Sequence, residues 1–122
     1  LRMSVQISVP GVLEPPTSIR PTTTNVTDAL SIAAGGAGKT VIGIIVANED
    51  GSARLASVWW NNGTTDFLIF ERSIPANETV TEALALPIQL NAKAAAKKIK
   101  VQAAAADVVT FTLITTQLSQ GS

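Results

Sequence analysis

Turn-forming dipeptides recur at short intervals along this chain, and they limit the length of any regular element. Asp50-Gly51 and Asn62-Gly63 are the strongest of them, because both pairs readily adopt the positive φ angles of a tight hairpin turn. Residues 75–78 form a further turn signal between two apolar segments. Such turn signals recur about every 8–12 residues, which is typical of an all-β sandwich.

The segments between these turns are rich in β-branched residues, and most of them alternate apolar with polar positions as half-buried strands do. The sequence predicts strands over residues 25–32, 40–48, 53–60, 66–73, 79–86, 88–90, 98–103 and 108–118. Pro87 separates two of them, which predicts an edge strand or a bend. We therefore expect an all-β protein, an antiparallel β-sandwich or jelly roll of about eight strands.

Two structures compete for residues 91–107. This segment is rich in Ala and Lys, which favour a helix, and a helix over residues 92–106 stays open as an alternative. Strict alternation over residues 98–102 favours a strand. We expect the strand, with one helical turn over Ala92 to Ala96.

Residues 1–24 differ from the rest of the chain because four prolines interrupt them. Proline excludes a helix and biases the residue before it to extended geometry. The sequence predicts an extended N-terminal arm over residues 1–24, with a short strand at residues 5–9, and a β-sandwich domain over residues 25–120. The arm is either a disordered terminus or a segment that lies on a neighbouring subunit.

Composition excludes several classes of function. The 122 residues include no His and no Cys, which removes the commonest general base, disulfides and thiolate metal sites. Nine basic residues balance nine acidic ones, which argues against binding to nucleic acid or to anionic membranes. No apolar run approaches the ~20 residues of a membrane span, and residues 1–10 lack the apolar region of a signal peptide. We expect no enzymatic activity, no cofactor and no metal.

Two patterns that could support chemistry lack the necessary context. Gly35 to Thr40 is similar to a phosphate-binding loop, but Ala33 stands where that motif requires Gly, and a strand follows instead of a helix. We interpret this segment as a turn between strands. A glycosidase would need two facing carboxylates, whereas most of the acidic residues fall in predicted turns or on polar faces.

Trp59 and Trp60 are adjacent in a predicted strand, so their side chains should point to opposite faces. One should enter the core, and the other is then exposed or covered. Burial of both, an interface and a carbohydrate-stacking platform all stay open. The candidate interface residues are Pro10, Pro15, Pro16, Ile19, Pro21, Trp59 and Trp60.

The stretch from Thr40 to Thr116 resembles small β-sandwich virion proteins of tailed bacteriophages, which decorate the head or associate with the tail or neck. The matching segments are Val41-Ile42-Gly43-Ile44-Ile45-Val46-Ala47-Asn48, Asp50-Gly51-Ser52-Ala53, Ser73-Ile74-Pro75-Ala76-Asn77-Glu78-Thr79, Leu90-Asn91-Ala92, Ile99-Lys100-Val101-Gln102-Ala103 and Ala106-Asp107-Val108-Val109-Thr110. The chain departs from this group at residues 95–98, where Gly-Asp often stands, so a tight turn is in doubt there.

The resemblance implies a structural virion protein, with capsid decoration through self-association and arm-mediated docking as the first hypothesis. It implies that the partners are other copies of the chain and major capsid or tail proteins. A homo-oligomer of cyclic symmetry is expected, such as a trimer. The alternatives are a neck, tail or fibre component and a carbohydrate-binding module. No catalytic residue carries over.

Overall fold

The computed structural model describes residues 12–117, with only the backbone for residues 85–87. This part of the chain contains eight strands and no helix. The strands are β1 (Thr17–Ile19), β2 (Thr27–Ile32), β3 (Lys39–Asn48), β4 (Arg54–Asn61), β5 (Asp66–Ile74), β6 (Thr79–Leu90), β7 (Lys97–Ala103) and β8 (Val109–Gln117). The prediction of an all-β sandwich of about eight strands is confirmed. The strand predicted at residues 5–9 lies outside the described residues.

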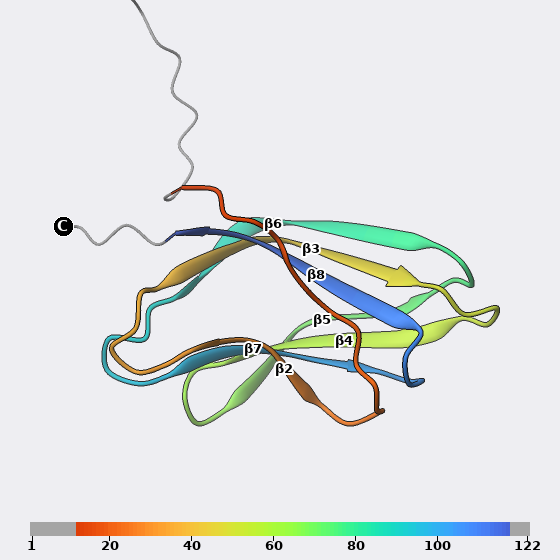
Figure 1. Cartoon of the computed structure of the whole chain (residues 1–122), viewed down its shortest axis with the longest axis horizontal. Coiled ribbons are helices and arrows are strands. Elements are labelled where there is room, and N and C mark those ends of the chain that lie inside the picture. The colour runs from red at the N-terminus through yellow and green to blue at the C-terminus, as the bar shows by residue number, and fades with distance from the viewer. Residues whose placement is uncertain (1–11, 118–122) are drawn as a thin grey trace, which may run out of the picture.

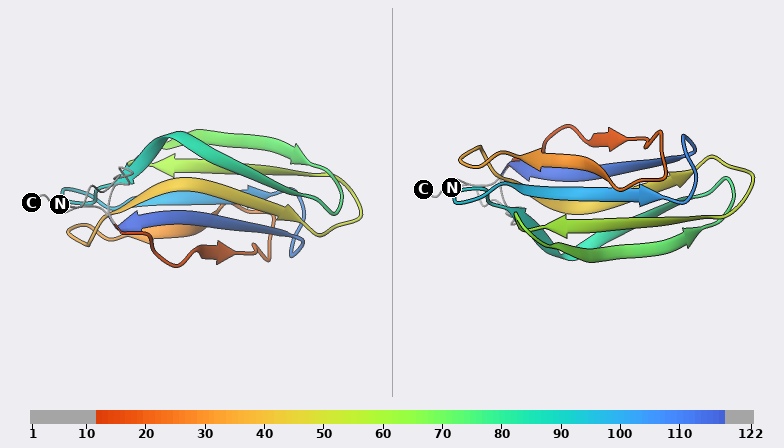
Figure 2. Two further views of the ribbon diagram at one scale, coloured as in Figure 1. Left: turned by 90° about the horizontal axis from the view of Figure 1, so that it is seen from above. Right: turned by 90° about the horizontal axis from the view of Figure 1, so that it is seen from below.

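The strands form two four-stranded sheets that pack face to face (Figure 1). One sheet has the order β1-β8-β3-β6 and the other the order β2-β7-β4-β5. The strands of both sheets run close to the long axis of the molecule (Figure 2), which is the aligned type of sheet packing. Every connection except β4–β5 passes from one sheet to the other, so the core forms only when distant segments meet.

Alternate side chains of the inner strands fill the space between the sheets. The largest fully buried apolar side chains are Phe111, Ile44, Ile74, Leu90, Ile99, Leu113, Val41, Val46, Val58, Val101 and Val109. They come from both sheets, as expected when the core-facing positions of each strand recur with a period of two. Burial of one such side chain contributes about 1.5–3 kcal/mol, so the inner face determines the register of every strand.

Residues 97–103 form strand β7, and no helix occurs in residues 92–106. The helical turn expected over Ala92 to Ala96 is wrong, since residues 93–95 form a bend and Ala92 and Ala96 have no regular structure. Ala92 is buried, and its carbonyl oxygen accepts a hydrogen bond from the Gly35 amide at 2.8 Å. Tertiary contacts thus override the helix propensity of the alanines, because Ile99 and Val101 can be buried only by a strand in this sheet.

The two strands expected on either side of Pro87 are one strand, β6, at the edge of its sheet. Its pairing with β3 shifts between Val41 and Gly43, where the β6 partner changes from Ile88 to Ala83. The intervening residues of β6 leave the regular ladder at that point. Proline, which has no amide hydrogen to donate, is tolerated at such an edge and irregularity.

The described part of the N-terminal arm, residues 12–24, lies on the sandwich of its own chain. Strand β1 pairs with β8 through Thr17–Leu113, Ser18–Thr112 and Ile19–Phe111. The segment crosses the side of the sandwich from one sheet toward the other (Figure 1). The sheet therefore includes residues from within the predicted arm, because Ile19 alternates with polar neighbours and packs against the core.

Asparagine side chains hold the loops at both ends of the sandwich. Asn48 is buried, and its amide nitrogen donates to the carbonyl oxygens of Ser52, Ile74 and Pro75 at 2.9, 3.0 and 3.2 Å. At the other end, Asn61 donates to Asp66 at 2.7 Å and accepts from the Gly63 amide at 2.8 Å. These bonds satisfy buried polar groups that the strands leave without partners.

Candidate functional site

The predicted interface residues do not form one surface. Pro10 lies outside the described residues, and Pro15 and Pro16 are exposed. Ile19 packs against the core, whereas Pro21 is buried and its carbonyl oxygen accepts from the Asp107 amide at 2.8 Å. The arm positions after Pro16 thus make contacts within the chain, while the two prolines before β1 face solvent.

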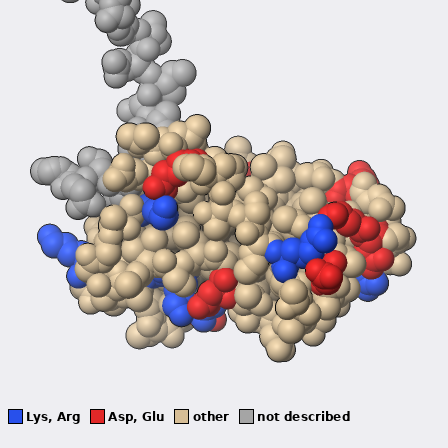
Figure 3. All heavy atoms as spheres, viewed as in Figure 1, with Lys and Arg blue, Asp and Glu red and all other residues tan. Residues whose placement is uncertain are grey.

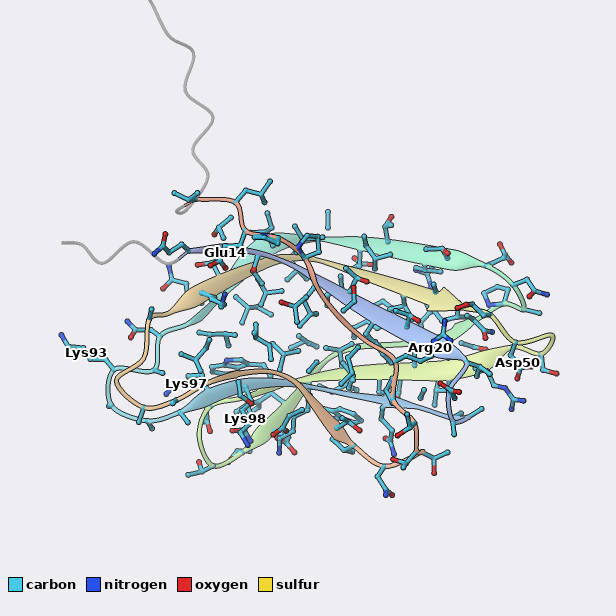
Figure 4. All side chains as sticks on the ribbon, viewed as in Figure 1. Glu14, Arg20, Asp50, Lys93, Lys97 and Lys98 are labelled. Atoms are coloured by element: carbon cyan, nitrogen blue, oxygen red, sulfur yellow. The ribbon has the colours of Figure 1, made fainter. Side chains whose placement is uncertain are left out.

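A polar cluster fastens the start of the described segment to the sandwich. Lys39 donates to the two carboxylate oxygens of Glu14 at 3.0 and 3.1 Å, and the Thr115 hydroxyl donates to the same carboxylate at 3.0 Å. The Glu14 amide also donates to the Thr115 carbonyl oxygen at 3.0 Å. Figure 4 shows Glu14 beside the strands of the β1-β8-β3-β6 sheet. Lys39 is therefore engaged as a structural ion pair at the start of β3.

Arg20 fastens the other end of β1. Its guanidinium group pairs with the Glu49 carboxylate, and its Nε donates to the Thr110 hydroxyl at 3.2 Å. Arg54 pairs with Asp50 in the loop that follows β3, and Figure 4 shows Arg20 and Asp50 at the same end of the molecule. Acidic and basic groups lie side by side in this view of the surface (Figure 3), so no broad patch of one sign faces the viewer.

Trp59 lies on the outer face of the β2-β7-β4-β5 sheet. The register places Lys100 of β7 on one side of it and Leu68 of β5 on the other. Trp59 is half-buried, and Leu68 is 53% exposed. Lys100 pairs with Asp66 at 3.2 Å, so its side chain extends across β4 beside the tryptophan.

Trp60 points the other way and packs against the hydrophobic core. Its ring stacks on Phe67 with 5.5 Å between ring centroids. Its indole Nε1 is buried and has no hydrogen-bond partner in the described part of the chain. The two tryptophans thus divide as expected: Trp60 joins the core, and Trp59 faces outward.

A shallow hollow opens on the same outer face at Ser57, two positions before Trp59 on β4, and Trp59 is not among the residues that line it. Its volume is about 340 Å³, and its lining includes Leu55, Ser57 and Gln102. Gln102 donates to the Thr24 carbonyl oxygen at 2.9 Å, so the loop before β2 forms one wall. The hollow offers a hydroxyl, an amide and apolar carbon, but no ionisable side chain.

Hydrogen bonds hold the pKa values of two carboxyl groups, those of the half-buried Asp50 and the exposed Asp66, below their usual range. For Asp50 the main cause is the Arg54 side chain. For Asp66 it is the hydrogen bond from the Asn61 amide, followed by a smaller contribution from Lys100. These hydrogen bonds stabilise the charged form of each carboxyl group, which lowers the pKa of both. These groups are structural partners of neighbouring side chains, and neither lines the hollow at Leu55, Ser57 and Gln102.

The described residues contain no group of three or more His, Cys, Asp or Glu side chains that could hold a metal ion. Five of the acidic residues are in ion pairs, namely Glu14, Asp28, Glu49, Asp50 and Asp66. The sequence predicts that the segment from Gly35 to Thr40 is a turn between strands. Gly35 and Gly36 lie in the turn after β2, whereas Lys39 and Thr40 already belong to β3, and no helix follows. Within residues 12–117 there is also no helix of the length and hydropathy that a membrane crossing needs.

Sequence reasoning missed the outer face of the β1-β8-β3-β6 sheet. Gly43 and Ile45 lie on this outer face, because Ile44 and Val46, which alternate with them along β3, point into the core. A glycine within an otherwise apolar strand was a usable signal, since it often marks a bulge or a close approach. Because residues 41–47 are a continuous apolar run apart from Gly43, the sequence alone does not show which face of the strand Gly43 occupies.

No protein-family model matches this sequence, and no curated protein or solved structure is significantly similar to it. The resemblance to bacteriophage virion proteins therefore stays a prediction.

Proposed function

We propose that this chain is a structural virion protein of a tailed bacteriophage, which decorates the capsid by binding to copies of itself and to other virion proteins. We further propose that the sandwich is a jelly roll. The strand order supports this assignment, since β1 pairs with β8, β2 with β7, β3 with β6 and β4 with β5. Virus capsid proteins frequently use such a double Greek-key arrangement, although the fold alone implies no function.

The observation that carries the proposal is the placement of large apolar side chains on the surface. Leu55 and Leu68 are 46% and 53% exposed on the same outer sheet face as Trp59. Val12 and Leu13, at the start of the described segment, are 67% and 63% exposed. Exposed apolar groups are common singly, but groups of them with an aromatic residue favour contact with other proteins.

The copy number per particle tests this proposal. Quantitative mass spectrometry of purified virions, calibrated on the major capsid protein, would report hundreds of copies for a decoration protein. A handful to a few dozen copies would assign the chain to the neck, tail or fibre. Its absence from particles would refute a virion role.

Binding to carbohydrate is a second candidate, and Trp59 favours it. The half-buried indole lies on the same outer face as a hollow that is lined by Leu55, Ser57 and Gln102. This face therefore offers both apolar and hydrogen-bonding groups, which suit a sugar ring. A glycan array with the intact chain tests this candidate. Signals that disappear in Trp59→Ala but persist in Leu13→Ala would support it, and an array without signals would reject it.

A further inference from the structure

The middle of the outer face of the β1-β8-β3-β6 sheet carries no charged side chain. Ile44 and Val46 point inward with 1% and 0% exposure, so the alternate positions Gly43 and Ile45 point outward. Cross-strand partners share a face with them. We call this set the uncharged face, and its residues are Gly43, Ile45, Thr81, Ala83, Thr112 and Ile114.

A hollow of about 310 Å³ lies over Gly43 on the uncharged face. A Cβ atom at Gly43 would lie 3.6 Å from the Glu82 carbonyl oxygen and 3.7 Å from Cγ1 of Ile114, which are ordinary contacts. Gly43 is also not among the glycines with positive φ in the described residues. Neither the packing of this chain nor its backbone conformation therefore requires glycine at this position.

Glycine within a strand is nevertheless unfavourable relative to alanine. It is found where a bulge needs it or where another group approaches closely. The register does shift between Val41 and Gly43, but the bulge that requires glycine has a left-handed residue, which Gly43 is not. The remaining explanation is the approach of a group from outside the chain.

We propose that the uncharged face is a self-association surface, on which a second copy of the chain packs the same face about a two-fold axis. A side chain of the second copy would enter the hollow over Gly43. This inference rests on the proposed function, because it names the surface through which copies would meet. Its commitment to a second copy follows from charge and from area.

Charge favours a second copy because a two-fold contact brings the same patch of both molecules together. Like charges near the axis would then repel each other, and none of the six residues of the uncharged face is charged. Glu82 of the edge strand β6 lines the hollow beside this face. The outer face of the other sheet is different, since Lys98, Lys100 and Asp66 lie on it. Arg20 marks one end of the uncharged face and is paired with Glu49.

The area is sufficient for a stable contact. The four strands of the whole sheet have 3, 9, 10 and 12 residues, and at ~4.8 Å spacing and ~3.3 Å rise they cover roughly 540 Å² per copy, with the uncharged face at the centre. Two copies that pack this whole outer face would therefore bury on the order of 1,100 Å², which is close to the roughly 1,000 Å² of a specific interface. A contact of this size suits modest affinity that is reinforced by many copies.

Sedimentation analysis of the full chain over a concentration series tests this surface. We expect reversible self-association of the wild type, and its loss in Ile45→Lys. Gly43→Ala should raise the dissociation constant at least tenfold, about 1.4 kcal/mol, while the unfolding midpoint of the dilute protein is unchanged or higher. Weaker association without a loss of stability would show that Gly43 acts in a contact between copies, because a residue needed for the fold would lower the unfolding midpoint when it is replaced.

Val26→Lys is the matched control, since it places the same charge at an exposed β-branched side chain just before β2, which belongs to the other sheet. Equal loss of association in Val26→Lys and Ile45→Lys would overturn the inference, and so would a monomeric wild type at every concentration. The virion measurement remains separate. A chain that is present in particles but monomeric would refute this surface alone, and a self-associating chain that is absent from particles would refute the virion role alone.

Discussion

The side-chain amide of Asn48 donates to the carbonyl oxygen of Ile74 at 3.0 Å, and this bond joins the end of β3 in one sheet to the end of β5 in the other. The side-chain Oδ1 of Asn48 accepts a hydrogen bond from the Asp50 backbone amide at 3.0 Å. One buried side chain therefore fixes the loop between β3 and β4 and the turn after β5. The alignment of the two sheets at this end depends on it.

Replacement of Asn48 by alanine should lower the free energy of unfolding by about 2–3 kcal/mol, because several backbone groups lose their buried partner. Urea denaturation measures the loss. Asn91→Ala is the control, since Asn91 is exposed and accepts one hydrogen bond from the Lys93 amide. Similar losses in both variants would contradict the role of Asn48.

Gly63 should tolerate no side chain, whereas Gly51 should. Gly63 has a φ of +113°, and a Cβ there would lie 3.1 Å from the Ala96 carbonyl oxygen. We expect Gly63→Ala to lower the free energy of unfolding by about 1–3 kcal/mol. Gly51 has nothing within 4 Å of a Cβ and no positive φ, so Gly51→Ala should have little effect. Thermal denaturation of both variants checks this difference.

The ion pair between Lys39 and Glu14 should stabilise the protein more than an open surface pair does. Thr115 shares the carboxylate, and the side chains of the pair are 30% and 23% exposed. Lys39→Met should lower the free energy of unfolding by about 0.5–1.5 kcal/mol. Lys98→Met, which removes the more exposed pair with Asp28, should lower it by less. An equal result in 1 M salt and in dilute buffer would argue against an electrostatic origin.

Removal of residues 12–24 should destabilise the sandwich. This deletion removes β1 and the packing of Ile19 on the core. A chain that begins at residue 25 should therefore have a free energy of unfolding that is roughly 2–4 kcal/mol lower than that of a chain that begins at residue 12. Urea denaturation of the two chains measures this difference. Equal stability would restore the boundary of the sandwich to residue 25, as the sequence predicts.

Acid should weaken the fold through Asp50 and Asp66. Both carboxyls have lowered pKa values in the folded protein, so the unfolded chain binds protons first, near its pKa of about 3.9. Their stabilisation is present above that pH and is lost as the pH falls through the lower folded pKa values. Urea denaturation from neutral to acidic pH should show this decline. In the double variant Asp50→Asn and Asp66→Asn the decline should be smaller, and an unchanged decline would assign it to other carboxylates.

Local pattern predicted most of the strands, because each inner strand alternates between core and surface. Residues 98–103 were predicted as a strand on alternation alone, against the helix propensity of their neighbours. The hairpin turn at Asn62-Gly63 follows from a backbone preference for positive φ, which Gly63 adopts. Asp50-Gly51 also turns the chain, but the hairpin expected there is wrong, because Gly51 has no positive φ and β3 and β4 belong to different sheets. The opposite directions of Trp59 and Trp60 follow from the same period of two.

The sequence by itself determined the strand content, the turns and the absence of His and Cys chemistry, since these depend on residue type and short-range geometry. Only the tertiary structure decided which strands are neighbours, because pairing joins segments as distant as Ser18 and Thr112. It also decided that β1 belongs to the sandwich and that Gly43 opens a hollow on an outer face. Those features arise from contacts between sheets and strands that no local pattern encodes.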